Sequence, residues 1–216
     1  MIIKSGEKIP DNILKELQGI NEKYTKDRDF NIYLDRLGKL FNISKQNIRT
    51  EKKLFLAGYL EGEGSLSFSI KKNLNAKYGV TLDPEFNVTQ HINGVEQLYT
   101  YLQIFQTGRI TYKSGSNATL VFKISNRRSL EEKVIPFWNM YVAPYATQAK
   151  QQRFLKFQKV LELFREDCHT KLDCLTCEML PLWDSMRIQK GQSNESFPDL
   201  QSAVDYVQTF VKKSKK

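Results

Sequence analysis

The chain has 216 residues, of which 40% are hydrophobic and 26% charged, so it can bury one sizeable core but is short for two full domains. Thirty-three Lys and Arg residues against 24 Asp and Glu residues give a net charge of +9, which favours polyanionic partners through long-range attraction. No stretch approaches the ~20 apolar residues of a membrane span and no apolar leader precedes residue 10, so a soluble, non-secreted protein without membrane attachment is expected.

The first fifty residues are predicted to form a helical extension. Residues 11–24 carry apolar side chains at helical spacing, and Asp11 can cap this helix after Pro10. A second helix is expected over residues 30–41. The extension carries basic residues that form either a solvated face or contacts to nucleic-acid phosphates, namely Lys8, Lys15, Lys23, Lys26, Arg28, Arg36 and Lys39.

A change of pattern at Thr50 marks the central segment. Thr50 can cap a buried helix that ends at Gly64. Residues 65–70 then alternate polar and apolar side chains, and an extended pattern resumes at residues 80–82 and 86–90. These segments predict a first hairpin.

A helix and a second hairpin complete the central segment. Asn93 starts a helix that ends before Gly108. Residues 109–113 and 119–125, joined by a turn at residues 114–117, form the hairpin. Its predicted apolar face consists of Ile110, Tyr112, Leu120, Phe122 and Ile124. Ser129 and Glu132 form a capping box for a further helix around Pro136.

The C-terminal segment is predicted to be helical. Helices are expected around residues 147–165, 171–189 and 199–212, and the basic tail 212–216 follows. The fold class is therefore α+β. An α-β-β-α-β-β-α core with an antiparallel sheet occupies residues 51–150, between helical extensions at residues 1–50 and 151–216.

The cysteines lie close together near residue 170. Three is an odd number, which argues against a secreted disulfide framework and fits a reducing compartment. A tetrahedral zinc site is one interpretation, with the ligands Cys168, His169, Cys174 and Cys177. Small core cysteines on a helix are the favoured alternative, because Leu172, Leu175 and Met179 continue the helical spacing.

The residues from Leu56 to Gly64 read LAGYLEGEG. They resemble the signature of the LAGLIDADG homing endonucleases, with Glu61 and Glu63 at the two acidic positions. Residues 86–90, FNVTQ, are similar to the family's strand that ends in a catalytic-pocket glutamine, and the element order matches the family's core. Within the family the chain most resembles the single-motif members encoded in ribosomal-RNA introns of algal organelles.

This resemblance implies a site-specific endonuclease that acts as a homodimer with Mg²⁺ and no small-molecule cofactor. It implies a staggered double-strand cut in a long, near-palindromic double-stranded DNA target. The target would be an intronless allele of the host gene, and the protein would act in an organelle such as the chloroplast. Metal binding would fall to Glu63, which departs from the usual Asp, together with the backbone carbonyl of Gly62. Gln90 would order water around the nucleophile, and the basic pocket residue would be Lys150 or, less well aligned, Arg153.

The spacing of the signature independently favours pairing of two helices. Gly58 and Gly62 share a helix face, where missing side chains allow close approach of a second helix from another copy. Glu63, at the negative helix end, would meet its symmetry mate, and two like charges need a cation such as Mg²⁺ between them. Glu61 is interpreted as a structural acid, with direct metal contact as the alternative. The expected dimer interface comprises Leu56, Ala57, Gly58, Tyr59, Glu61 and Gly62.

The strand faces opposite the apolar positions are polar enough to contact base edges and phosphates. On the first hairpin the polar face comprises Ser67, Ser69, Lys71, Asn73, Thr81, Asp83, Glu85 and Asn87, and Lys72 and Lys77 supply further positive charge. All of these except Glu85 are predicted to bind DNA. On the second hairpin the predicted DNA-binding residues are Arg109, Thr111, Lys113, Ser116, Asn117, Thr119 and Lys123. Two alternatives remain open: an RNA-binding group I intron maturase with the same fold, and a DNA-binding regulator without nuclease activity.

Overall fold

The computed structural model describes residue 4, residues 6–187 and residues 196–214. They divide into two compact units, the first formed by residues up to 65 with 85–147, the second by residues 66–84 with 148 onward. The predicted division into segments 1–50, 51–150 and 151–216 is based on the order of helices and strands along the chain. This division stays a prediction. Within the described residues, none of the helices is both long and apolar enough to cross a membrane.

The strands form one four-stranded sheet. They are β1 (Gly64–Lys72), β2 (Val80–His91), β3 (Arg109–Tyr112) and β4 (Thr119–Ile124), in the order β1-β2-β4-β3. β4 pairs antiparallel with both neighbours, so that Phe122 lies opposite Val88 on β2 and Ile110 on β3. The α+β class and the antiparallel sheet are confirmed.

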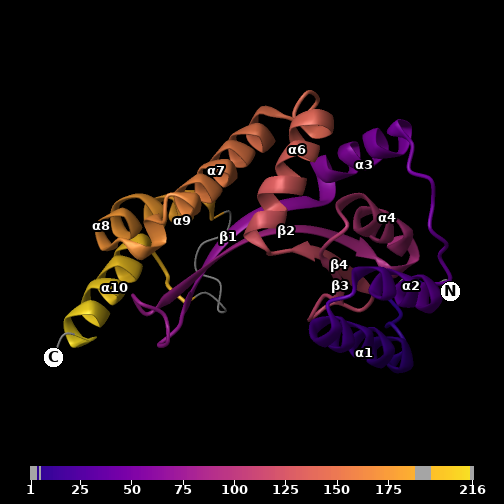
Figure 1. Cartoon of the computed structure of the whole chain (residues 1–216), viewed down its shortest axis with the longest axis horizontal. Helices are drawn as coiled ribbons and strands as arrows, with labels where there is room; N and C mark the ends of the chain where they lie inside the picture. The colour runs from indigo at the N-terminus through magenta and orange to yellow at the C-terminus, as the bar shows by residue number, and fades with distance from the viewer. Residues whose placement is uncertain (1–3, 5, 188–195, 215–216) are drawn as a thin grey trace. The chain divides into compact units, whose positions relative to one another are not determined.

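The helices of the first unit follow the predicted order (Figure 1). They are α1 (Asp11–Asp27), α2 (Phe30–Phe41), α3 (Thr50–Glu63), a 3-10 turn (Ile92–Gly94), α4 (Val95–Phe105) and a continuous helical run from α5 (Arg127–Ser129) through α6 (Ile135–Phe137) to Val142. From α3 to this run the order is α-β-β-α-β-β-α, as predicted.

Aromatic side chains fill the core between α4 and the sheet. The ring planes of Tyr101, Phe105 and Phe122 are nearly parallel, with centroids 5.8–6.1 Å apart. Phe86 meets Phe105 and Phe122 edge-on, at 5.6 and 6.2 Å. The Tyr101 hydroxyl, in turn, donates a 2.7 Å hydrogen bond to the Leu56 carbonyl and so fixes α3 against this core.

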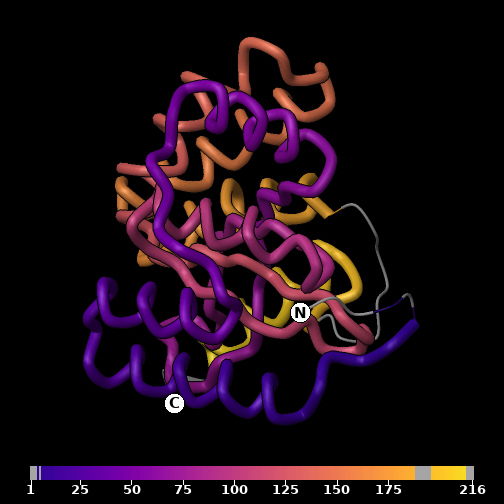
Figure 2. Tube along the Cα trace, turned by 90° about the vertical axis from the view of Figure 1, so that its right-hand side faces the viewer, coloured from indigo at the N-terminus to yellow at the C-terminus, as the bar shows by residue number. Residues whose placement is uncertain are grey.

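The N-terminal helices close the outer edge of the sheet. Figure 2 shows α1 and α2 as two neighbouring coils of the indigo part of the trace. Asn21 donates to the Ile110 carbonyl at 3.0 Å, and the Ile110 N–H donates to the Tyr33 hydroxyl at 2.9 Å. These side chains satisfy backbone groups of an edge strand that would otherwise be open to pairing.

Four predicted helix details are wrong. Thr50, predicted as a cap, is the first helical residue of α3, and the N-cap is Arg49. Pro10 is the N-cap of α1 and Asp11 is already helical. The helix after β4 is capped by the Asn126 side chain, which accepts from the Ser129 N–H at 2.9 Å, so Ser129 does not form a capping box. The helix predicted as buried before Gly64 has exposed side chains at Leu54 and Phe55.

The helical run after β4 also contains wide turns that the sequence did not indicate. Ile135 N donates to Leu130 O and Ala143 N donates to Trp138 O, each five residues back. Proline has no N–H and its ring crowds the preceding turn. Pro136, between the two π-helical turns, accounts for this local widening.

The second unit consists of the first hairpin's tip and the C-terminal helices. These are α7 (Gln148–Arg165), a 3-10 turn (Cys168–Thr170), the run from α8 (Leu172–Cys174) through a π turn (Leu175–Met179) to α9 (Leu180–Met186), and α10 (Leu200–Ser214). The three predicted C-terminal helices are therefore confirmed, although predicted residues 188–189 and tail residues 215–216 lie outside the described residues. At the hairpin tip, Gly79 has φ +72° and the Phe210 ring lies against it, which excludes a side chain there.

Cys168 and Cys174 form a disulfide, so the expectation of reduced core cysteines is wrong for this pair. The two residues adjoin the 3-10 turn and α8, and their Cα atoms are 5.2 Å apart, within reach of a bridge. Cys177 is free and exposed. Two of the four proposed zinc ligands are thus bonded to each other, and the zinc interpretation gains no support.

Candidate active site and nucleic-acid interface

Glu63 lies exposed at the last helical position of α3. A Cβ at Gly64 would lie 2.6 Å from the Leu60 carbonyl oxygen, so this helix-to-strand corner requires glycine. The corner leaves Glu63 at the carbonyl end of the helix, where the helix dipole disfavours a carboxylate unless a cation is near. The backbone carbonyl of Gly62 belongs to the same last turn, in which helical carbonyls have no partner within the helix.

Thr89 holds the Glu63 side chain and was missed by sequence reasoning. Its hydroxyl donates to Glu63 Oε2 at 3.2 Å, and its own carbonyl accepts from the Tyr59 hydroxyl at 3.2 Å. Phe86 and Val88 face the core, so Asn87 and Thr89 face the opposite side of β2. Strand alternation alone would have placed Thr89 on the polar face, although nothing in the sequence pairs it with Glu63.

Gln90 is the next-to-last residue of β2 and lies opposite Leu120 of β4. Its Oε1 accepts from the His91 N–H at 2.7 Å, and a Cβ at Gly94 would lie 2.6 Å from its Nε2. No hydrogen bond joins Gln90 to Glu63 among the residues that the structure describes. The proposed water-ordering role therefore stays a prediction, and it requires the side chain to release the His91 N–H.

Glu61 has the contacts expected of a structural acid. Its Oε1 accepts from the Thr147 hydroxyl at 2.6 Å and from the Thr147 N–H at 3.3 Å. These bonds tie α3 to the end of the first unit, after the helical run that follows β4.

The two candidate basic residues differ in their surroundings on α7. Arg153 donates from Nε to the Leu66 carbonyl at 2.7 Å and from a terminal nitrogen to the Met186 carbonyl at 2.9 Å. Burial lowers the pKa of its guanidinium. Arg153 thus links β1, α7 and α9 inside the second unit, whereas Lys150, in the first turn of α7, is half-buried. Lys150 is accordingly retained as the preferred basic residue.

The alternation predicted for the strands is observed. Leu66, Phe68 and Ile70 on β1 are buried, and the intervening Ser67 and Ser69 are partly exposed. On β3 and β4 the buried residues are Ile110, Leu120, Phe122 and Ile124, with Arg109, Thr111, Thr119 and Lys123 on the other face. Tyr112 is an exception: it is exposed at the strand end, and its hydroxyl donates to the Ser116 carbonyl.

Two cations on the polar strand faces, Lys71 and Lys123, are paired with acids. Lys71 forms a 3.1 Å ion pair with Asp83, and Asn73 donates to the Thr81 hydroxyl at 2.8 Å. In the first unit, Lys123 forms an ion pair with Glu85, and the Asn87 amide lies 3.5 Å from Glu85. Such half-exposed pairs are weak enough for a polyanion to rearrange them.

Two lysines predicted to bind DNA have other partners. Lys72 follows Ile70 by two residues and therefore shares the core-facing parity of β1, with its ammonium 5.2 Å above the Phe197 ring and 5.3 Å above the Tyr206 ring. The predicted DNA contact of Lys72 stays a prediction. Lys77 donates to the Thr170 carbonyl at 2.8 Å, so it holds the hairpin tip to the 3-10 turn.

The tip of the second hairpin is also internally bonded. Ser116 donates to the Lys113 carbonyl at 2.7 Å and accepts from the Thr119 N–H at 3.2 Å. Asn117 donates to the Gly6 carbonyl at 3.3 Å and accepts from the Ile9 N–H at 3.0 Å. These bonds fix the turn, and the Lys113 side chain remains exposed there.

One face of α3 is open and apolar. Ideal Cβ atoms built at Gly58 and Gly62 meet nothing within 4 Å, and the side chains of Leu54 and Phe55 are 43% and 56% exposed. Tyr145, at 79% exposure, flanks this face. By contrast, Leu56 and Ala57 are buried within the chain. The expected helix-pairing surface therefore narrows to the side that carries the two glycines.

Comparison with known proteins gives concordant matches. The family description "LAGLIDADG endonuclease" matches residues 56–161. The DNA endonuclease I-CeuI of Chlamydomonas moewusii is 52% identical over 211 residues, which covers 98% of this chain and 97% of that protein. The structure of the group I intron-encoded homing endonuclease I-CeuI complexed with DNA superposes with a TM-score of 0.92 at 52% identity, covering 95% of this chain and all of that one. The archaeal intron-encoded homing endonuclease I-Vdi141I complexed with DNA gives a TM-score of 0.64 at 28% identity, over 74% of this chain and 96% of that one.

Proposed function

Because the chain belongs to the LAGLIDADG endonuclease family, we propose that it is a site-specific homing endonuclease that hydrolyses phosphodiester bonds in double-stranded DNA. The observation that carries this proposal is the exposed Glu63 carboxylate at the end of α3, held by Thr89 from the polar face of β2. A metal-ligating type of side chain thus adjoins a strand face suited to nucleic-acid contact. A staggered cut in a long, near-palindromic target follows from two such sites related by two-fold symmetry.

The residues at this position fit Mg²⁺. The donor set contains only hard oxygen atoms, namely the Glu63 carboxylate and the Gly62 carbonyl, and the ion prefers such ligands together with water and phosphate. When bound, Mg²⁺ would stabilise the charge that develops on the phosphate and on the leaving oxygen. Thr89 would orient the carboxylate and Lys150 would add positive charge. Gln90, near the end of β2, would order water after releasing the His91 N–H.

A homodimer is the assembly proposed for this chain. The open face of α3 with Gly58 and Gly62 allows close approach of a second copy, and the exposed Leu54 and Phe55 would lose contact with water in it. Each copy contains one signature helix, so pairing brings two Glu63 side chains to the two strands of one target.

DNA recognition is assigned to the outward residues of the strands. In the second unit these include Ser67, Ser69, Lys71, Asn73, Thr81 and Asp83, and in the first unit Asn87, Arg109, Thr111, Lys113, Thr119 and Lys123. Their hydroxyl, amide and cationic groups match base edges and phosphates. The target is proposed to be an intronless allele of the host gene in an organelle such as the chloroplast.

Incubation with a supercoiled plasmid library, with Mg²⁺ or with EDTA, tests this function. Linear DNA that forms only with Mg²⁺ is the expected result. A maturase would instead bind structured intron RNA and leave every plasmid intact, and a regulator would retard DNA in gels without cutting it. Intact plasmids in Mg²⁺, from a library that samples the target, would overturn the assignment.

A further inference from the structure

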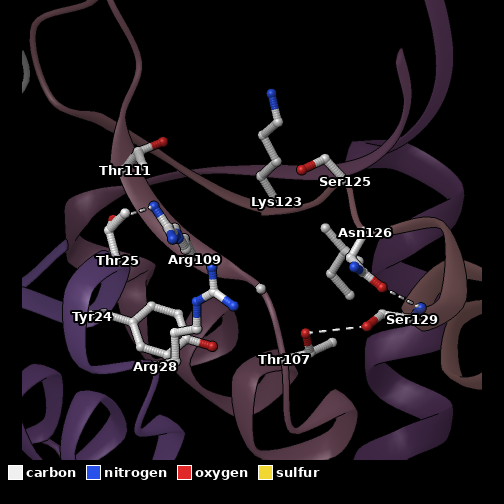
Figure 3. A pocket seen from close by; sticks show the side chains of 12 residues that line it. Tyr24, Thr25, Arg28, Thr107, Arg109, Thr111, Lys123, Ser125, Asn126 and Ser129 are labelled. Carbon is white, nitrogen blue, oxygen red and sulfur yellow. Dashed lines mark hydrogen bonds between the residues drawn. The ribbon is translucent and has the colours of Figure 1, made fainter. Parts of the chain in front are cut away.

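A polar hollow lies where the end of α1 meets strands β3 and β4 (Figure 3). It has a volume of about 840 Å³, and both the N-terminal helix and the predicted DNA-reading strands line it. Tyr24, Thr25 and Arg28 come from the end of α1, whereas Arg109, Thr111 and Lys123 come from the strands. The charged side chains that line it are all cations.

Arg109 is held in a fixed position at the hollow. Its guanidinium carbon lies 5.2 Å from the centre of the Tyr24 ring, and a terminal nitrogen donates to the Thr25 hydroxyl at 2.9 Å. The Tyr24 ring is itself stacked on the buried Tyr33 at 4.3 Å. A guanidinium held by stacking and one hydrogen bond keeps its remaining N–H donors for a ligand.

Arg28 reaches into the same hollow from the end of α1. It is the C-cap of the helix, with φ 55°, and its N–H donates to the Tyr24 carbonyl at 3.0 Å. In Figure 3 its side chain rises beside the Tyr24 ring toward Arg109. Across the part of the chain that the structure describes, no carboxylate lies within 4.0 Å of either guanidinium. Two like charges converge without a local counter-charge, which favours an anion between them.

The chemistry of the lining selects a phosphate group. Guanidinium forks and hydroxyl donors match phosphate oxygens. Thr111 and Lys123 belong to the strand face proposed to contact DNA, so a duplex on that face would bring its backbone to the hollow. Lys123 is partly neutralised by Glu85, so Arg28 and Arg109 would provide most of the attraction.

We propose that this hollow binds a phosphodiester group of the DNA backbone, with Arg28 and Arg109 as phosphate ligands and with Tyr24 and Thr25 as positioning residues for Arg109. The end of α1 is then part of the DNA interface, and the N-terminal helices do more than close the sheet edge. This inference rests on the proposed DNA binding. The contact is independent of base sequence, so it contributes equally to target and non-target duplexes.

The test compares Arg28→Ala with Lys15→Ala, which removes the same charge from the exposed face of α1 outside the hollow. Binding of a fluorescent 40-base-pair duplex of mixed sequence is followed by anisotropy at several salt concentrations. For each lost phosphate contact, the slope of log affinity against log salt should become shallower by about 0.9. When the salt concentration rises fourfold, the fold-loss of affinity in the variant should therefore be about 3.5 times smaller than in the wild type. Lys15→Ala should keep the wild-type slope.

Further variants separate the remaining outcomes. Arg28→Lys should restore the slope because the charge returns, and Thr25→Val should weaken binding less than Arg28→Ala because both arginines stay. Equal slopes for Arg28→Ala, Lys15→Ala and the wild type would overturn the phosphate site while leaving DNA binding intact. If Arg28→Ala instead weakened only the binding of inorganic phosphate, the hollow would serve a free anion and the DNA contact would be wrong. A wild-type protein that binds no duplex would overturn the proposed function and this inference together.

Discussion

Glu63 is the residue on which the proposed chemistry depends. Glu63→Gln keeps the shape of the side chain and its acceptor for Thr89 but removes the charge that binds a divalent ion. We expect cleavage to be lost while specific DNA affinity changes less than about threefold, equivalent to about 0.6 kcal/mol. Gel retardation and a cleavage assay on the same target measure the two effects.

Glu61→Gln, two residues earlier on α3, is the matched control for this substitution. Its Oε1 can still accept from Thr147, so cutting should persist and stability should change by about 1 kcal/mol or less. Equal cutting by Glu63→Gln and the wild type would remove Glu63 from the metal site. Loss of cutting in both variants would mean that Glu61 also contacts the metal.

Thr89 positions Glu63, and its contribution can be measured separately. Thr89→Val removes one hydroxyl with little change of volume, and the loss of one hydrogen bond of about 1 kcal/mol should lower the single-turnover cleavage rate about fivefold. The concentration of Mg²⁺ required for half-maximal rate should rise, because the carboxylate is less well oriented. Thr176→Val, on the C-terminal helices and bonded to the Leu172 carbonyl, should leave both quantities unchanged.

An unaltered Mg²⁺ dependence in Thr89→Val would contradict this positioning role.

The positions of individual side chains show which contacts could not be predicted from the sequence. The direction of the Lys72 side chain could not be predicted, because its partners, the rings of Phe197 and Tyr206, lie more than a hundred residues further along the chain. The partners of Thr89 and Arg153 lie 26 and 87 residues away in sequence, beyond any local pattern.

At the scale of elements, the N-terminal helices stabilise the edge strand β3. The Tyr33 hydroxyl accepts from the Ile110 N–H and donates to Asn21, and burial raises the pKa of Tyr33, so it stays neutral. Tyr33→Phe leaves a buried donor without its partner and should lower the free energy of unfolding by about 1–3 kcal/mol in urea titrations.

Tyr24→Phe is the control, because it keeps the ring stacked on Tyr33 and, among described residues, its hydroxyl makes no hydrogen bond. Its stability should stay within about 0.5 kcal/mol of the wild type. If both tyrosine variants unfolded alike, the edge-closing role of the Tyr33 hydroxyl would be refuted.

The open face of α3 gives a second prediction at this scale. Gly58→Leu meets nothing within 4 Å in the single chain and replaces a helical glycine, which should raise monomer stability by roughly 0.5–1 kcal/mol. The same side chain would separate two paired helices, so sedimentation should show a monomer that no longer makes double-strand cuts.

Gly19→Leu on α1 has equally open surroundings and should leave the assembly unchanged. A Gly58→Leu protein that still sediments as the wild-type dimer would place the interface elsewhere. If the wild-type protein sedimented as a monomer on its DNA target, the proposed homodimer would be wrong.

Most elements could be predicted because their signals are local. Helical spacing, strand alternation and glycine stops gave the order from α1 to α10, and Gly64 marked the corner that places Glu63. The π turns around Pro136 and the Cys168–Cys174 bridge could not be predicted, because each depends on which geometry the surrounding packing permits. Leu56 and Ala57 were included in the expected dimer interface, but both are buried within the chain. The spacing of the glycines identifies one side of a helix but not how many neighbouring residues belong to that side.

At the scale of the whole molecule, the net charge of +9 is distributed unevenly between paired and unpaired cations. Lys71 and Lys123 are already paired with acids, whereas Arg28 and Arg109 have no such partner among the described residues. Salt dependence of DNA binding should therefore arise more from the hollow beside α1 than from the cations in strand ion pairs.

Two copies of this chain are proposed to cut one DNA site through paired Glu63 carboxylates. Sequencing of the ends released from a randomised DNA pool in Mg²⁺ tests this proposal most directly, with Glu63→Gln protein as the background. We expect one long consensus with approximate two-fold symmetry and cuts at fixed, staggered positions on the two strands. Ends scattered without a consensus, or the same ends released by Glu63→Gln, would contradict it.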